Sequence, residues 1–169
     1  MSSLKFVYVT YIASTPEKLW RALTESQFTK QYWFGFEIEA DWKSGGRICF
    51  VNEGKVSDSG EVLEWRPHTR LSYGWQLQCD EISQKENEIS QKEKPSRVCF
   101  DLEPMGKETK LTVTHDQFEP GSKVFGSISN GWPLVLSSLK SFLETGCALA
   151  APAFHHAHEV PEQAVARAS

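Results

Sequence analysis

Apolar and polar residues alternate with a period of two over much of the chain, which predicts β-strands. The clearest alternation is "RLSYGWQLQ" at residues 70–78, where a large apolar side chain occupies every second position from Leu71 onward. Such a pattern places the large side chains on one face, so that face is predicted to be buried. Shorter runs rich in β-branched and aromatic residues predict further strands at residues 4–12, 36–41, 47–51, 61–65, 96–103 and 109–116.

Turn residues separate these predicted strands. Pro67 and His68 form a tight connection, and Met105 with Gly106 closes the last hairpin. The segment "SDSG" at residues 57–60 is also predicted to lie outside the strands, because Ser, Asp and Gly favour turns. Short connections of this kind are typical of an antiparallel sheet.

A helical period marks "NGWPLVLSSLKSFLETG" at residues 130–146. Asn130 is the predicted N-cap, Pro133 lies near the predicted start, and Gly146 is the predicted stop. The apolar residues form one stripe, which consists of Trp132, Val135, Leu136, Leu139, Phe142 and Leu143. This stripe covers either a filled core or the roof of a cavity, and periodicity alone favours the core.

Two shorter helices are predicted after the first strand, at residues 15–24 and 26–32. Pro16 suits the first helical position of the first of them, and Trp20 is predicted to pack in the core between that helix and the sheet. The order of strand, short helices, antiparallel strands and long helix predicts an α+β fold with a mostly antiparallel sheet.

The composition excludes several classes of function. The chain has 169 residues, which is the size of one domain, and its formal net charge is -4 without a basic cluster. Nucleic acid is therefore not an expected partner, because phosphate neutralisation dominates such binding. No apolar run approaches the roughly 20 residues of a membrane span. The first residues lack the layout of a secretory signal, so the cytoplasm is the expected location.

The sequence offers no set of residues for metal, cofactor or covalent chemistry. The four cysteines are widely and irregularly spaced, and Cys49 and Cys99 are predicted to be small buried side chains in strands. The run "HHAH" at residues 155–158 has no Cys or carboxylate at a convincing ligand spacing. No nucleophile elbow, zinc-protease motif or phosphate loop occurs. We therefore expect no metal, no cofactor and no catalytic residue.

Two segments stand apart from the domain. Residues 79–96 contain "EISQKEN" followed by "EISQKEK", a near-perfect tandem copy that is predicted to be a charged, duplicated loop insertion. A partner-binding arm is the alternative for this segment. Residues 147–169 are rich in alanine and are predicted to be a disordered tail. Residues 1–146 then form the domain.

A set of stretches resembles one known family. In chain order they are "YVTYIASTPEKLWRALTE", "QYWFG", "ADWKSGGRICF", "GEVLEWRPHTRLSYGW", "VCFDLEP", "TKLTVTHDQFEPGS" and "SNGWPLVLSSLKSFLETG". They run from Tyr8 to Gly146 in the order of the family. The chain is similar to the activator-of-heat-shock-protein-90-ATPase homologue (AHSA-type) group of the START-like superfamily, also called SRPBCC or Bet v-like.

The resemblance implies the helix-grip fold, in which a curved antiparallel sheet wraps around a long C-terminal helix. Members of the superfamily hold apolar molecules in a cavity between sheet and helix. The residues expected to line such a cavity here are Trp33, Phe34, Trp42, Phe50, Tyr73, Trp75, Phe100, Val113, His115, Trp132, Leu136 and Leu139. For each of them the alternative is ordinary core packing. The alternative for His115 is a hydrogen-bonded structural histidine.

The leading hypothesis for function is non-catalytic binding of a small hydrophobic or aromatic molecule, such as a lipid, polyketide or polyphenol. A co-chaperone that regulates a heat-shock ATPase is a less favoured alternative. An enzyme of cyclase or hydrolase type is another, and it would use His115 as its acid or base. A role in stress response and the formation of a homodimer stay open.

Overall fold

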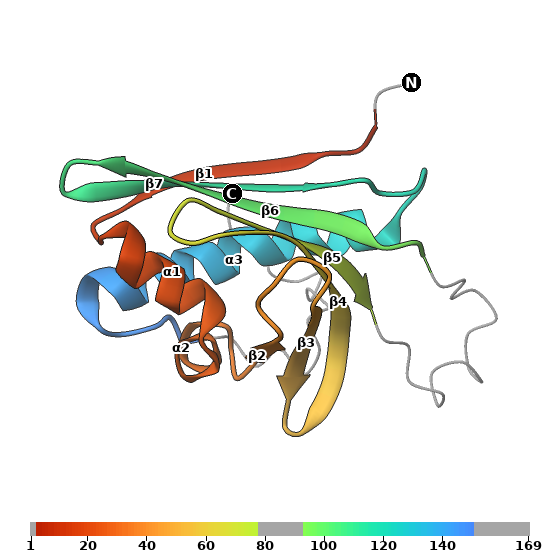
Figure 1. Ribbon diagram of the computed structural model, residues 1–169, viewed down its shortest axis with the longest axis horizontal. Helices are drawn as coiled ribbons and strands as arrows, with labels where there is room; N and C mark the ends of the chain where they lie inside the picture. The colour runs from red at the N-terminus through yellow and green to blue at the C-terminus, as the bar shows by residue number, and fades with distance from the viewer. Residues whose placement is uncertain (1–2, 78–92, 151–169) are drawn as a thin grey trace, which may run out of the picture.

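The computed structural model describes residues 3–77 and 93–150, in which an antiparallel sheet and a long helix enclose the core (Figure 1). The elements are β1 (Phe6–Ile12), α1 (Pro16–Thr24), α2 (Ser26–Tyr32), β2 (Glu37–Ala40), β3 (Arg47–Asn52), β4 (Lys55–Arg66), β5 (Arg70–Leu77), β6 (Ser96–Met105), β7 (Glu108–Asp116) and α3 (Lys123–Thr145). This order confirms the predicted α+β class and the helix-grip arrangement.

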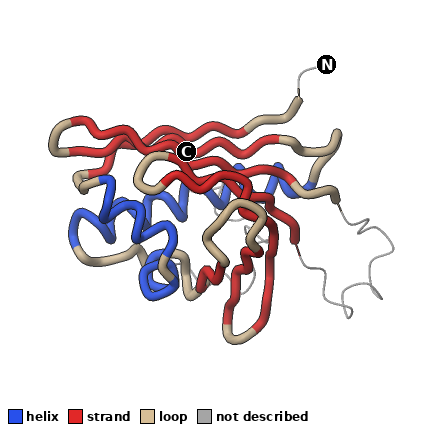
Figure 2. The backbone as a smooth tube through the Cα atoms, in the orientation of Figure 1, coloured by secondary structure: helices blue, strands red, loops and turns tan. Residues whose placement is uncertain are grey.

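The strands form a seven-stranded sheet in the order β1-β7-β6-β5-β4-β3-β2, and each neighbouring pair is antiparallel. Strands β1, β7 and β6 run across the view in Figure 2, whereas β3 and β4 run down it, so the sheet bends strongly along its width. The pairing is irregular between Val62 and Glu64 of β4 and between Phe50 and Val51 of β3, and such bulges bend a strand locally. The bent sheet wraps around α3.

The core lies between the inner face of the sheet and α3. The apolar face of β5 that the alternation predicted is buried at Leu71 and Tyr73, which are 0% and 1% exposed. On α3, Trp132, Leu136 and Leu139 are buried against it, as the helical stripe predicted. The opposite face of the sheet carries charge pairs, in which Arg70 contacts both Glu64 and Asp101 at 2.6 Å.

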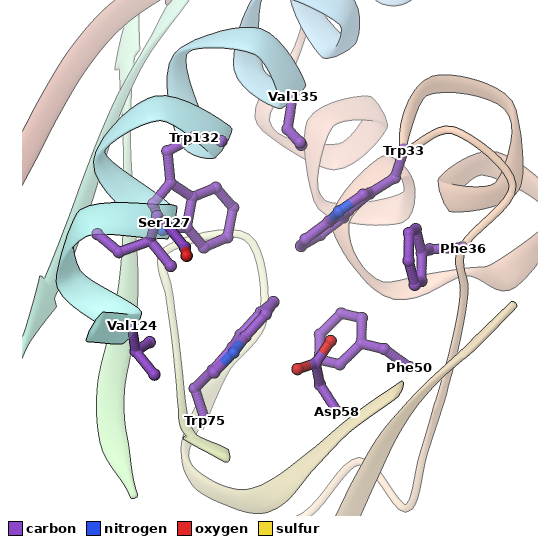
Figure 3. Close-up of a pocket in the computed structure, with 11 residues that line it drawn as sticks. Trp33, Phe36, Phe50, Asp58, Trp75, Val124, Ser127, Trp132 and Val135 are labelled. Atoms are coloured by element: carbon purple, nitrogen blue, oxygen red, sulfur yellow. The ribbon is translucent and has the colours of Figure 1, made fainter. Parts of the chain in front are cut away.

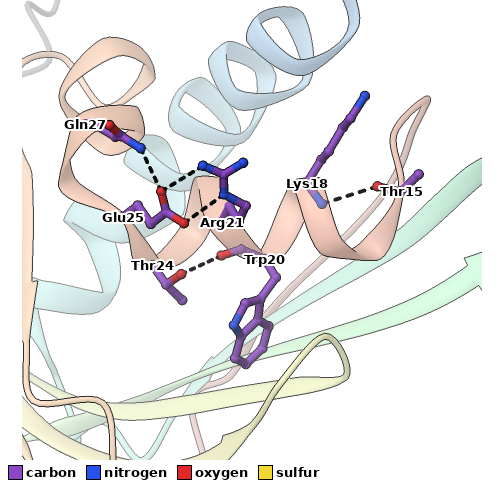
Figure 4. Close-up of polar contacts among 7 residues, drawn as sticks. All are labelled: Thr15, Lys18, Trp20, Arg21, Thr24, Glu25 and Gln27. Carbon is purple, nitrogen blue, oxygen red and sulfur yellow. Dashed lines mark hydrogen bonds and ion pairs between the residues drawn. The ribbon is translucent and has the colours of Figure 1, made fainter.

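Helix α1 begins where the sequence predicts (Figure 4). The Thr15 hydroxyl accepts a hydrogen bond from the Lys18 amide at 3.3 Å, and Pro16 occupies the first turn. The exposed pair Arg21 and Glu25 spans one turn of the helix. Trp20 is 5% exposed and packs on Trp65 with ring centroids 4.9 Å apart, which confirms its predicted place in the core.

The start of α3 was predicted wrongly. The helix begins at Lys123 rather than near Asn130, so Pro133 lies inside it. Ser122 caps the helix by accepting a hydrogen bond from the Phe125 amide at 3.1 Å, and Glu93 accepts from the Lys123 amide at 2.8 Å. A carboxylate here also complements the positive end of the helix dipole. Two glycines and a proline in this region have low helix propensity, so propensity alone does not predict a helix there.

The segment at residues 57–60 was also predicted wrongly, because it lies within β4. The true turn is Glu53-Gly54, where both residues have positive φ (50° and 77°) and Asn52 pairs with Lys55. This is the backbone of a tight two-residue hairpin. The consequence for the site is that Asp58 lies in a strand of the curved sheet rather than in an exposed connection.

Several sequence predictions fall wholly or partly outside the described residues. The duplicated segment 79–96 overlaps the undescribed residues 78–92, and most of the tail 147–169 lies in residues 151–169, which are likewise not described. Cys99 is buried and Cys49 is half-buried, and both are free thiols. Within the described part of the chain, none of the helices combines the length and the apolar character that crossing a bilayer requires.

The close approach of β4 and β5 requires a glycine at residue 60. A Cβ atom on Gly60 would lie 1.7 Å from the carbonyl oxygen of Gly74 on the neighbouring strand. Since that neighbour is backbone, Gly60→Ala forces the two strands apart, and we expect a loss of about 1–3 kcal/mol in the free energy of unfolding. Urea denaturation measures this loss. Gly54→Ala is not a suitable control, because Gly54 has a positive φ of 77° and alanine would be strained there.

The matched control is Gly126→Ala. Gly126 has no heavy atom within 4 Å of an added Cβ and lies in α3, where alanine is the better helix former. Gly126→Ala should therefore leave the stability unchanged or raise it slightly. Equal effects of the two substitutions would show that the close approach of β4 and β5 does not constrain the sheet.

Candidate functional site

A pocket of about 90 Å³ opens between the first half of α3 and the bent part of the sheet (Figure 3). The residue after α2 and the loop that follows supply Trp33 and Phe36, and the sheet supplies Phe50, Asp58 and Trp75. Helix α3 supplies the remaining wall, which consists of Val124, Ser127, Ile128, Gly131, Trp132 and Val135. The pocket is larger than a single water site, for which about 10–15 Å³ suffices.

Three tryptophan rings dominate the walls of the pocket. Trp33 and Trp132 lie edge to face with ring centroids 5.4 Å apart, and Trp75 and Trp132 do the same at 5.8 Å. Trp33 and Trp75 are close to parallel, with an interplanar angle of 17° at 6.2 Å. These rings come from three separate elements, so the wall forms only when the sheet, α2 and α3 have assembled.

Asp58 brings a carboxyl group into this aromatic wall, and Figure 3 shows the group directed toward the space between Trp75 and Phe50. Its residue is 7% exposed. The Ser57 hydroxyl donates to Oδ2 at 2.8 Å, whereas Oδ1 is buried without a hydrogen-bond partner among the described residues. Burial raises the pKa of the Asp58 carboxyl to about 6, and the hydrogen bond from Ser57 opposes this rise.

Trp75, another residue of the pocket wall, carries a second unpartnered polar atom. Its indole Nε1 is buried, and no described residue accepts a hydrogen bond from it. Buried polar groups are hydrogen-bonded in the great majority of cases, so an orphaned donor and an orphaned acceptor in one pocket mark a place for a polar partner. The site therefore combines an apolar surface with two unused polar atoms.

His115 lies behind the pocket wall and not in it. The indole N–H of Trp132 donates to His115 Nδ1 at 3.1 Å, so the ring proton is on Nε2 and donates to the Ser96 hydroxyl at 2.7 Å. The residue is 0% exposed, and burial lowers the pKa of its imidazole to about 3. Both nitrogens of a neutral ring are thus used inside the protein, which favours the structural role over the ligand-orienting one.

The residues predicted to line a cavity have three different positions. Trp33, Phe50, Trp75 and Trp132 border the pocket. A second group is buried in the core outside it and consists of Tyr73, Phe100, Val113, His115, Leu136 and Leu139. Trp42 stacks on Trp65 with centroids 4.9 Å apart, and Phe34 is half-buried with a positive φ of 49°. Contact with a ligand stays a prediction for all of them.

Sequence reasoning missed Asp58 and the first half of α3. Asp58 was assigned to a turn, although its spacing of four residues from Val62, an even number along a strand, could have placed both on the inner face. Val124, Ile128 and Val135 recur at helical spacing and could have extended the predicted helix. Phe36, Ser127 and Gly131 carry no comparable signal, because only the folded chain brings them to the pocket wall.

The described residues contain no cluster of three or more His, Cys, Asp or Glu side chains that could hold a metal ion. Within the part of the pocket wall that the structure describes, Asp58 is the one side chain that titrates near neutral pH. A single carboxyl group without a nucleophile or second acid beside it is better suited to recognition than to general acid–base chemistry.

Comparison with known families gives a match over residues 13–144 to the family described as Activator of Hsp90 ATPase homolog 1-like protein. Comparison with functionally curated proteins finds no match. The match covers α1, α2, all strands from β2 to β7 and nearly all of α3.

Solved structures with the same fold include protein MLL2253 from Mesorhizobium loti, at 27% identity and a TM-score of 0.67, covering 83% of this chain and 96% of that one. The Aha1 dimer from Colwellia psychrerythraea is 23% identical with a TM-score of 0.64, covering 85% and 98%. PFC0360w, an HSP90 activator from Plasmodium falciparum, is 22% identical with a TM-score of 0.65, covering 83% and 96%.

Proposed function

Because the chain belongs to the family of Activator of Hsp90 ATPase homolog 1-like proteins, whose members share this fold, we propose that it binds a small apolar or aromatic ligand in the pocket between the bent sheet and α3. The observation that carries the proposal is a largely aromatic pocket whose wall residues include two buried polar atoms without partners among the described residues. Ligand sites combine apolar walls with a few polar groups that fix orientation. The protein acts by binding and carries out no chemistry.

The size of the pocket limits the ligand. About 90 Å³ is less than the 150 Å³ cavity that holds benzene in an engineered protein, so only part of a larger ligand would be enclosed. Phe36, Ser127 and Gly131 are half-buried and provide the open side. A ligand that places one small group between the tryptophans and extends past Gly131 fits this shape.

A substitution that fills the pocket tests the proposal. Gly131 borders the pocket, and an added Cβ there would meet no heavy atom within 4 Å, so Gly131→Leu directs a side chain into open space. A panel of small aromatic and aliphatic compounds is screened by thermal shift and by tryptophan fluorescence. We expect some compounds to stabilise the wild type, by about 2.7 kcal/mol at a hundredfold excess over Kd. Gly131→Leu should abolish this effect.

Gly126→Leu is the matched control, because Gly126 lies on the same helix, is exposed and also has open space around its Cβ position. Both substitutions replace a helical glycine with a better helix former, so both should keep or raise the stability of the free protein. Native mass spectrometry of protein purified from its own host would then look for co-purifying small molecules. If no compound shifts the wild type, or if both variants respond like it, the pocket is not a binding site.

A co-chaperone role is the second candidate function. It is favoured by the description of the family and by the solved HSP90 activator from Plasmodium falciparum with the same fold. Exposed Val7, Val9 and Tyr11 on the edge strand β1 offer an apolar surface for a protein contact. A pull-down that retains a heat-shock ATPase, together with stimulation of its ATP hydrolysis, would favour this function. If the ATPase is neither retained nor stimulated, the co-chaperone role is excluded.

A further inference from the structure

We infer that the pocket recognises a small organic cation, in which an ammonium group on an apolar body pairs with Asp58 inside the tryptophan wall. This inference rests on the proposed function and names its ligand class. It is carried by the position of a buried, incompletely paired carboxyl group among aromatic rings. Three properties of the pocket support it, namely its charge, its aromatic faces and its size.

The charge of Asp58 has no counterpart within the described protein. Its side chain takes part in none of the ion pairs of the described residues, and its one hydrogen bond comes from the neutral Ser57 hydroxyl. Burial of an unpaired carboxylate is unfavourable unless a cation or several donors compensate it. A protonated amine supplies both at once, because its N–H donates to Oδ1 and its charge balances the carboxylate.

The aromatic walls favour a cation over a neutral group of the same shape. Tryptophan faces attract ammonium groups within about 6 Å of the ring centroid, and tryptophan is the strongest of the aromatic side chains in this respect. Trp33, Trp75 and Trp132 all border the pocket, with mutual centroid distances of 5.4 to 6.2 Å. A carboxylate surrounded by indole faces is therefore a matched environment for a positive charge.

The volume of the pocket and the indole N–H of Trp75 restrict the class of ligand further. A volume of about 90 Å³ suits a head group such as a dimethylammonium rather than a whole ring system. The unpartnered indole N–H of Trp75 is a donor only, so it requires an acceptor that an ammonium lacks. An oxygen placed a few bonds from the nitrogen, as in an amino alcohol or amino ether, would accept this hydrogen bond.

The inference predicts weaker binding in acid, because the pKa of Asp58 in the free protein is about 6. Among the described residues, few titratable groups face Asp58 from neighbouring strands. Tyr73 on β5 is buried with a pKa raised well above 10, and His115 on β7 contacts Trp75 from behind and stays neutral. Strand β3 presents Phe50, and the residues of α3 in the pocket wall are not ionisable. The titration of Asp58 therefore controls the pH dependence of binding.

A pair of isosteric probes tests the inference. Protonated 2-(dimethylamino)ethanol and neutral 3-methylbutan-1-ol have the same heavy-atom shape and the same hydroxyl group, and differ in N–H⁺ against C–H. Their dissociation constants are measured by NMR titration, following the tryptophan indole N–H signals at pH 7.5 and pH 5. We expect the amine to bind at least about tenfold more tightly than the alcohol at pH 7.5. The preference should shrink at pH 5.

Two variants complete the experiment. Asp58→Asn keeps the size of the side chain and removes its charge, so it should reduce the preference for the amine to about twofold or less. Gly131→Leu should weaken both probes equally. Equal binding of the two probes to the wild type, or an unchanged preference in Asp58→Asn, would overturn the inference and leave the proposed function in place. Failure of both probes overturns it as well, and the compound panel then decides the proposed function separately.

Discussion

Replacing Trp132 with alanine should lower the free energy of unfolding by about 3–5 kcal/mol. Trp132 is 3% exposed and packs edge to face against Trp33, Trp75 and Phe100. Its removal therefore leaves a cavity at the point where α3 meets both the pocket and the sheet. It also removes the donor to His115 Nδ1, which would then be a buried acceptor without a partner. Urea denaturation followed by far-UV circular dichroism measures the loss.

The packing and hydrogen-bonding contributions of Trp132 can be separated. Trp132→Phe keeps an aromatic ring but removes Nε1, so we expect a smaller loss of about 1–3 kcal/mol, most of it due to the unpaired imidazole nitrogen. Trp42→Ala is the matched control, because Trp42 is half-buried and packs on Trp65 away from the helix. A loss from Trp132→Ala no larger than that from Trp42→Ala would contradict a central role for Trp132 in the core.

The elements of this fold were predictable where a few neighbouring residues determine the local structure. Thr15 and Pro16 define the start of α1, and the alternation from Leu71 onward defines β5, because capping and period-two burial act within a few residues. The start of α3 was not predictable in this way. Glu93, which accepts a hydrogen bond from the Lys123 amide at the start of this helix, is 30 residues away from Lys123 in sequence. Local propensity at Gly126 and Gly131 argues against the helix that tertiary contacts stabilise.

The sequence named part of the pocket wall and missed the rest. The family resemblance implied a cavity between sheet and helix, and four of the aromatic residues named for it, Trp33, Phe50, Trp75 and Trp132, border the pocket. The boundary between pocket and core could not be located, since both use the same residue types and differ only in how completely α3 meets the sheet. Asp58 was missed because its neighbours Ser57, Ser59 and Gly60 form a typical turn composition, although they lie in a strand.

The buried carboxyl group of Asp58 should reduce the stability of the free protein at neutral pH. Its pKa rises from an ordinary value of 3.8 to about 6 on folding, so the folded state disfavours the charged form. The corresponding free energy is about 3 kcal/mol. Asp58→Asn removes this charge without a change of shape, and we expect the variant to be more stable than the wild type at pH 7 by up to about 3 kcal/mol. Residues held for binding at the expense of stability behave in this way.

The sign of the pH dependence distinguishes this explanation from a general gain in packing. As the pH falls through about 6, the folded wild type takes up a proton on Asp58 before the unfolded chain does, so the unfavourable contribution disappears by about pH 4. His115 has the opposite sign, because its pKa falls from 6.5 to about 3 on folding and the unfolded chain binds the proton first. The two contributions largely cancel in the wild type between pH 6 and 4, so Asp58 and His115 together should change its stability little there.

Asp58→Asn retains His115 and loses the compensating group, so its stability should fall more steeply with acidification than that of the wild type. The two curves are expected to differ by about 3 kcal/mol at pH 7 and to meet near pH 4. Urea denaturation at pH 7, 5.5 and 4 measures both curves. Exposed carboxyl groups such as Glu25 and Glu144, whose pKa values are lowered by Arg21 and Lys140, contribute equally to both proteins and cancel in the difference. Parallel curves would mean that folding leaves the pKa of Asp58 unchanged, so its carboxylate would not be in the buried, unpaired state on which the organic-cation inference rests.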